Sequence, residues 1–293
     1  MKKIITILLT VCFITVSGAQ ELTPFKDEKN KWGYKDEKGN ILIEAKYDWA
    51  EDFQNYNYDL AKVTLNQKVG YIDKTGKEII PLKYDYFYGF SEGISAVTQN
   101  GKMGFISKNG EELTPFSYDN VGEFSEGLAA VSINQKWGFI DKTGKIIIPL
   151  KYDFTGGETP SKFSEGLAAF RLKEKIGFID KTGKEVISSK YDLSGNFSEG
   201  LVAVSINYEW GFINKSGKVI IPLEYNLCGK FSEGLAPVKK GIKWGYLNKK
   251  GKVIIPLIYE FAEEFKSGKG KVYLNGNQFY IFENGETTLV EDE

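Results

Sequence analysis

Two sets of carboxylates recur along this sequence, and they are its best candidates for chemistry. One set is Glu92, Glu126, Glu165, Glu199 and Glu233, and the other is Asp48, Asp85, Asp119, Asp153 and Asp192. Two facing carboxylates suffice for a glycoside hydrolase, so a carbohydrate-active hydrolase using an Asp/Glu pair is one hypothesis. A catalytic pair is singular, however, whereas these acids repeat. We therefore expect Asp to accept hydrogen bonds in turns and Glu to pair with Lys or with backbone N–H groups.

The chain lacks the residues that most other catalytic mechanisms need. The chain has no His, which removes Ser-His-Asp and Cys-His centres and the commonest transition-metal ligand. No Gly-x-Gly-x-x-Gly or Walker pattern opens a helix, and no EF-hand loop occurs, so no cofactor is indicated. Basic and acidic residues are interspersed at a formal net charge of −1, which predicts no nucleic-acid partner. We expect a protein that is not an enzyme.

The recurring acids belong to an internal repeat of roughly 34 residues. One glycine, preceded by Trp or another apolar residue, marks its seven copies: Trp32-Gly33, Val69-Gly70, Met103-Gly104, Trp137-Gly138, Ile176-Gly177, Trp210-Gly211 and Trp244-Gly245. The four Trp could form a sugar-binding platform, but Val, Met and Ile substitute at the same position. We therefore expect these Trp to lie in the core.

The fullest copy predicts three short strands at 128–132, 137–141 and 146–148, joined by polar links of hairpin length. Pro149 cannot donate to a strand ladder, so we expect it to end the third strand. A linker with a Phe follows, and we expect it to pack between units, because a three-stranded unit cannot bury both faces alone. Both chain ends fit the same pattern, giving eight meanders.

The predicted fold class is all-β: tandem three-stranded antiparallel meanders in an open β-repeat array, with a closed propeller-like ring as the alternative. Residues 1–19 read as a signal peptide, with Lys2 and Lys3, an apolar run and Ser17-Gly18-Ala19. Residues 20–293 then form one repeat domain of seven repeats plus a degenerate C-terminal capping meander. We expect export to the periplasm, cell surface or medium, without a membrane span in the mature chain.

The fullest copy, with Lys136-Trp137-Gly138, Asp141-Lys142-Thr143-Gly144 and a downstream Ile-Ile-Pro, resembles the bacterial WG (KWG) repeat family. The resemblance covers nearly all of the mature chain. Departures occur where Trp is replaced, and at the Pro position, which is Glu44 in the first copy and Ser188 in the fifth. The resemblance implies an often exported repeat scaffold and no catalytic residues.

Insertions between copies are the candidate binding sites, because in repeat arrays they map to loops on one face. The first is Asn55, Tyr56, Asn57 and Tyr58, and the second begins Thr155, Gly156, Gly157 and Glu158. The hypothesis is an exported, non-catalytic scaffold that binds a protein or glycan partner. A hydrolase and a passive envelope protein without a specific ligand are the alternatives, and the sequence leaves the oligomeric state open.

Overall fold

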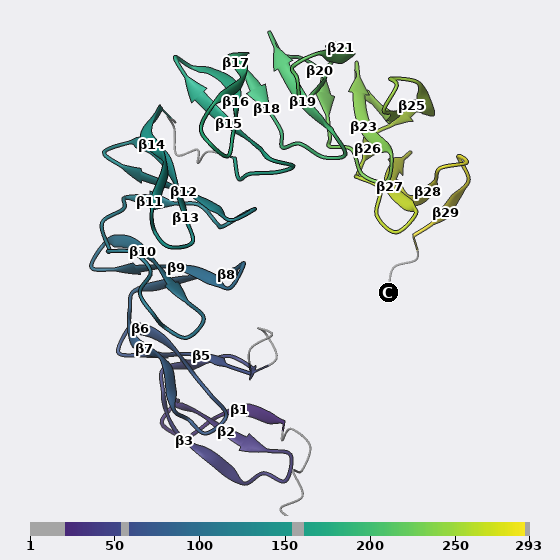
Figure 1. Cartoon of the computed structure of the whole chain (residues 1–293). Helices are drawn as coiled ribbons and strands as arrows, with labels where there is room; N and C mark the ends of the chain where they lie inside the picture. The colour runs from purple at the N-terminus through teal and green to yellow at the C-terminus, as the bar shows by residue number, and fades with distance from the viewer. Residues whose placement is uncertain (1–20, 54–58, 154–160, 291–293) are drawn as a thin grey trace, which may run out of the picture. The chain divides into compact units, whose positions relative to one another are not determined.

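The computed structural model describes residues 21–53, 59–153 and 161–290, and the chain divides into two compact units, Met1–Tyr84 and Asp85–Glu293. Within the described ranges the protein is all-β and contains no α-helix, so it has no helix that could cross a membrane. The strands form eight separate antiparallel sheets, each built from consecutive strands, and no sheet closes on itself (Figure 1). The expected series of antiparallel meanders is confirmed.

The first unit holds two sheets. The first sheet has β1 (Leu22–Lys26), β2 (Trp32–Asp36) and β3 (Ile41–Tyr47), and the second has β4 (Trp49–Ala50), β5 (Ala61–Leu65), β6 (Lys68–Ile72) and β7 (Glu78–Tyr84).

The second unit holds six sheets. The third has β8 (Tyr86–Ser91), β9 (Ile94–Gln99) and β10 (Lys102–Ser107); the fourth has β11 (Asn120–Val121), β12 (Leu128–Ile133), β13 (Lys136–Asp141) and β14 (Ile146–Asp153). The fifth has β15 (Leu167–Leu172), β16 (Lys175–Asp180) and β17 (Glu185–Tyr191); the sixth has β18 (Leu193–Ser194), β19 (Leu201–Ile206), β20 (Glu209–Asn214) and β21 (Val219–Tyr225). The seventh has β22 (Leu227–Cys228), β23 (Leu235–Lys240), β24 (Lys243–Asn248) and β25 (Val253–Tyr259); the eighth has β26 (Phe261–Ala262), β27 (Lys269–Leu274), β28 (Asn277–Phe282) and β29 (Thr287–Leu289).

The structure adds one feature to the expected unit and shows that the expected end of the third strand at Pro149 is wrong. The linker adds a fourth strand in five sheets, where a short segment such as β11 pairs with the first long strand, β12. The third strand also runs on through Pro149, because β14 is a sheet edge, where a residue without an N–H is tolerated. In the third sheet that strand is replaced by the bridges Met103↔Tyr118 and Ile106↔Glu112.

The repeated glycine is required by the shape of the third strand. Opposite Gly211, the pairing moves from Trp210↔Tyr225 to Phe212↔Ile221, so β21 carries extra residues that bulge over the glycine. A Cβ on Gly211 would lie 2.5 Å from the carbonyl oxygens of both Ile221 and Pro222. Only a residue without a side chain lets the two backbones approach this closely.

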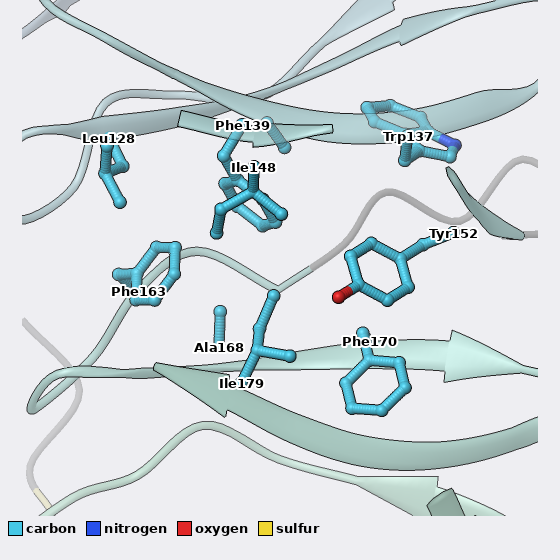
Figure 2. Packing of buried hydrophobic residues seen from close by; sticks show 10 residues of the cluster. Leu128, Trp137, Phe139, Ile148, Tyr152, Phe163, Ala168, Phe170 and Ile179 are labelled. Atoms are coloured by element: carbon cyan, nitrogen blue, oxygen red, sulfur yellow. The ribbon is translucent and has the colours of Figure 1, made fainter. Parts of the chain in front are cut away.

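Neighbouring sheets of the second unit pack face to face through apolar side chains. Figure 2 shows Phe139, Ile148 and Tyr152 of the fourth sheet packed against Ala168, Phe170 and Ile179 of the fifth. The linker Phe163 lies between them, with its ring centroid 5.0 Å from that of Phe139. Burial of each such side chain contributes about 1.5–3 kcal/mol, so the sheet interfaces form the core.

The end faces of the first and eighth sheets are polar. Lys35 of β2 is exposed and stands where the other sheets carry a buried Ile or Leu, such as Ile213. Lys269 and Lys271 of β27 occupy the positions of the buried Leu201 and Ala203 in the sixth sheet. These lysines replace apolar residues that pack against a neighbouring sheet elsewhere in the array.

Candidate functional site

Three of the recurring Asp side chains, Asp48, Asp119 and Asp192, each accept hydrogen bonds from two neighbouring sheets. Asp119 accepts one hydrogen bond from the Lys102 ammonium (2.5 Å) of the third sheet and one from the Asn134 N–H (2.7 Å) of the fourth. Asn134 and Gln135 form the β12–β13 turn with φ of 50° and 62°, the left-handed geometry of a two-residue hairpin. The Lys102 hydrogen bond, followed by that from Asn134, holds the pKa of Asp119 below its usual value.

The same bonding recurs along the chain. Asp48 binds Lys31 and the N–H of Asn66, and Asp192 binds Lys175 and the N–H of Asn207. These carboxylates are therefore engaged by the fold, as the sequence predicts for turn acids.

The recurring Glu side chains connect consecutive sheets of the second unit. The Glu199 carboxylate, in the turn that opens the sixth sheet, accepts a hydrogen bond from the Gly234 N–H of the seventh sheet at 3.1 Å. It also pairs with Lys249, after β24 of the seventh sheet, at 2.8 Å. Equivalent contacts are Glu92 with Gly127 and Lys142, Glu126 with Gly166 and Lys181, and Glu165 with Gly200 and Lys215.

Backbone geometry shows that these Glu side chains have a structural role. Glu199 has φ of 53°, a left-handed conformation that a long side chain rarely adopts. Glu233 accepts hydrogen bonds from the N–H groups of Ser267 and Gly268 at 2.7 Å each, and at the next copy Ser267 itself replaces Glu. The Glu series is thus interrupted at the eighth sheet, where Ser267 stands at this position.

The periodic acids that the structure describes are thus spread along the array, each beside its own Lys and backbone N–H partners. Within residues 21–53, 59–153 and 161–290, no group of three or more His, Cys, Asp or Glu side chains could hold a metal ion. The expectation that Asp caps turns and Glu pairs with Lys and backbone N–H groups is confirmed by these contacts.

The repeated Trp residues are mostly interior. Trp137 is buried among fourth-sheet and fifth-sheet side chains, and Trp32 and Trp210 are half-buried against their cores. Trp244 is half-buried and also lines a surface groove. The expected core position of the Trp set therefore holds, with Trp244 partly available to solvent.

The predicted binding residues in the two insertions, Asn55 to Tyr58 and Thr155 to Glu158, lie outside the residues that the structure describes. A different surface feature is present in the second unit, between the linkers that open the seventh and eighth sheets. It is a groove of about 800 Å³, lined by residues including Leu227, Lys230, Trp244, Phe261 and Glu264. The sequence analysis did not predict this groove. A sequence signal for it is a small linker residue next to an aromatic one, as in Phe261-Ala262.

A smaller groove lies between the linkers of the third and fourth sheets. It has a volume of about 100 Å³ and is lined by residues including Tyr88, Phe105 and Phe124. Both grooves therefore lie at the linker edge of the second unit.

Solved structures resemble the chain in fold alone. A eukaryotic initiation factor is similar over 94% of this chain and 85% of its own, at 13% identity and a TM-score of 0.54. BamB from Moraxella catarrhalis (13% identity, 78% of this chain and 77% of that one, TM-score 0.42) and Hsv2 from Kluyveromyces lactis (11%, 77% and 87%, 0.40) are more distant. No curated protein sequence matches the chain.

A family model described as "WG containing repeat" matches seven consecutive segments of the chain: residues 32–68, 70–102, 103–137, 137–175, 176–210, 210–244 and 244–277. These segments contain the glycines over which the third strands bulge and the Glu and Asp side chains that join the sheets. The chain therefore belongs to the WG-repeat family.

Proposed function

We propose that this protein is an exported, non-catalytic β-repeat scaffold that binds a protein or glycan partner. The observation that carries the proposal is the engagement of the periodic carboxylates by the sheets themselves, as Glu199 illustrates with Gly234 and Lys249. An acid held by an ammonium and a backbone N–H is stabilised in its charged form and is a poor proton donor at neutral pH. Binding is therefore favoured over catalysis.

Exposed apolar side chains at the linker edge support a binding role. The first linker residue is Trp49 in the second sheet, Tyr86 in the third and Phe261 in the eighth, with exposed fractions of 52%, 57% and 45%. Aromatic residues are enriched in recognition surfaces because they bury a large area with few rotatable bonds. The grooves at the same edge add concave surface.

Export is supported by the composition of residues 1–19, with two Lys, an uncharged run and small residues before Gln20. Expression of the full chain in a bacterial host, followed by N-terminal sequencing of the extracytoplasmic fraction, tests this part. A mature protein that begins at Gln20 supports it. Retention of the intact leader in the cytoplasm contradicts it.

The binding role is tested by capture of envelope proteins and glycans on the immobilised mature protein. Variants with Tyr56 and Tyr58 changed to Ser, or with residues 155–161 shortened, test the two insertions. Tyr208→Ser is the matched control, because Tyr208 is 86% exposed at the tip of the β19–β20 hairpin. Loss of a specific partner in an insertion variant and not in the control places binding at that insertion.

Failure to retain any partner counts against the scaffold proposal. Hydrolysis of a glycan that is abolished by one carboxylate substitution, and not by the same change in other copies, would favour the hydrolase instead.

A further inference from the structure

We propose that the groove between the linkers of the seventh and eighth sheets binds a neutral oligosaccharide. The inference rests on the proposed binding function and names a ligand class and a place for it. It involves residues at positions 227–230, 232, 237, 244 and 261–266, all within the second unit.

An aromatic series forms one part of the groove and extends beyond it. The Trp244 ring lies 5.7 Å from the Phe261 ring in an edge-to-face arrangement, and Phe261 lies 5.7 Å from Tyr273 in the same way. Phe261 remains 45% exposed, although it contacts both rings. An exposed aromatic face carries partial negative charge and attracts the C–H groups on the flat side of a pyranose ring.

The charges of the groove compensate one another. Its lining contains Lys230 and Lys266 against Glu263 and Glu264, a formal sum of zero. Lys230 pairs with Glu264 at 3.0 Å, which joins the linkers of the two sheets. A groove without net charge gives no electrostatic advantage to an anionic or cationic ligand. Hydroxyl groups, which both donate and accept, match the two kinds of charged side chain.

Hydrogen bonds to backbone carbonyl groups hold the two linkers in place. The Tyr246 hydroxyl donates to the Glu263 carbonyl at 2.7 Å, and the Gly229 N–H donates to the Pro237 carbonyl at 2.8 Å. A groove whose walls are already fixed loses little entropy on binding. Its volume of about 800 Å³ lies in the usual range for small-ligand sites.

The test uses the whole mature protein and defined probes. Neutral oligomers of glucose, mannose and N-acetylglucosamine, each of four to six residues, are titrated by calorimetry and by Trp fluorescence, beside galacturonate oligomers of the same length. We expect at least one neutral oligomer to bind, the galacturonate series not to bind, and Phe261→Ala to weaken binding roughly tenfold.

Two pairs of variants distinguish loss of the binding site from loss of the fold. Tyr86→Ala removes an exposed aromatic from the same repeat position outside this groove, and we expect it to bind normally. Trp244→Ile introduces the residue that the chain itself carries as Ile176, and we expect weaker binding, whereas Trp210→Ile leaves binding unchanged. Thermal unfolding of each variant checks its folding.

The proposal is overturned if no neutral oligomer binds, if only galacturonate binds, or if Phe261→Ala and Trp244→Ile bind as tightly as the parent. Each of these results would overturn the oligosaccharide site without overturning the scaffold function. Capture of an envelope protein together with no binding of any neutral oligomer would overturn the glycan groove while supporting the scaffold.

Discussion

The hydroxyl of Tyr246 in the seventh sheet donates a 2.7 Å hydrogen bond to the backbone carbonyl of Glu263 in the eighth-sheet linker. In the first unit, Tyr34 makes the corresponding contact with Glu51 at 2.8 Å. The third to sixth sheets carry Phe105, Phe139, Phe178 and Phe212 at the same position. A hydroxyl thus ties the linker of the final sheet to the sheet before it.

Replacement of Tyr246 by Phe should loosen the eighth sheet. The change removes one half-buried hydrogen bond and keeps the ring, which lies 5.0 Å from Phe265, so we expect a loss of about 0.5–1.5 kcal/mol. Urea unfolding measures the loss, and hydrogen exchange of β27 and β28 locates it. Tyr86→Phe, at an exposed hydroxyl, should change neither; an unchanged Tyr246→Phe variant would contradict the prediction.

The carboxylate of Glu199 should contribute more through its backbone hydrogen bond than through its ion pair. Glu199→Gln keeps an acceptor for Gly234 and loses the charge pair with Lys249, so we expect a cost below about 1 kcal/mol. Glu199→Ala loses both contacts and should cost about 1–2 kcal/mol. Chemical denaturation of both variants, with exposed Glu209→Ala as control, tests the order; equal costs for Gln and Ala would contradict it.

Stability should fall in acid and stay level near neutrality. Hydrogen bonds from Lys102 to Asp119 and from Lys142 to Glu92 lead the effects that lower the pKa of these carboxyls in the folded protein. The unfolded chain therefore binds more protons as the pH falls through the ordinary carboxyl pKa of about 4, so the stabilisation is complete above that value and lost below it.

The chain has no His, so we expect a constant urea midpoint between about pH 6 and pH 8. Urea midpoints measured from pH 3 to pH 8 test both parts. Asp119→Asn should make the acid decline shallower. A decline that begins near pH 6.5 would contradict this account.

Alanine should be tolerated differently at two repeat glycines. At Gly211 the new Cβ meets the backbone oxygens of Ile221 and Pro222 at 2.5 Å, which cannot move without disturbing the bulge. At Gly104 it meets the Phe116 ring at 2.9 Å, and a side chain can turn away. We expect Gly211→Ala to lose about 1–3 kcal/mol more than Gly104→Ala in thermal or urea unfolding. A larger loss at Gly104 would contradict the role given to the bulge.

The meanders could be predicted from sequence because their signals are local. Glycine at turns such as Gly144, with φ of 81°, separates alternating apolar segments and fixes the hairpins. The linker strands could not be predicted, since β11 pairs through two residues and two residues show no periodicity. The course of β14 through Pro149 depends on its place at the sheet edge, which is a tertiary property.

The roles of the repeated acids could also be predicted, because a carboxylate that recurs from copy to copy is expected to make the same contact in each. The groove could not, because its walls come from different sheets. Phe261 and Trp244 are 17 positions apart, and Cys228 and Gly229 complete the surface from the preceding linker. Their juxtaposition depends on how one sheet packs on the next, and no spacing rule within a single unit contains that information.

The polar end faces have a consequence for how such chains can change length. Lys35 is found in the first sheet alone, and Lys269 and Lys271 in the eighth alone, whereas consecutive sheets within the second unit repeat the same apolar contacts. Duplication or deletion of a copy within the second unit therefore creates a junction of the existing kind and leaves these lysines in place. Variation in copy number is therefore a change that this architecture accepts readily, and it requires no change at Lys35, Lys269 or Lys271.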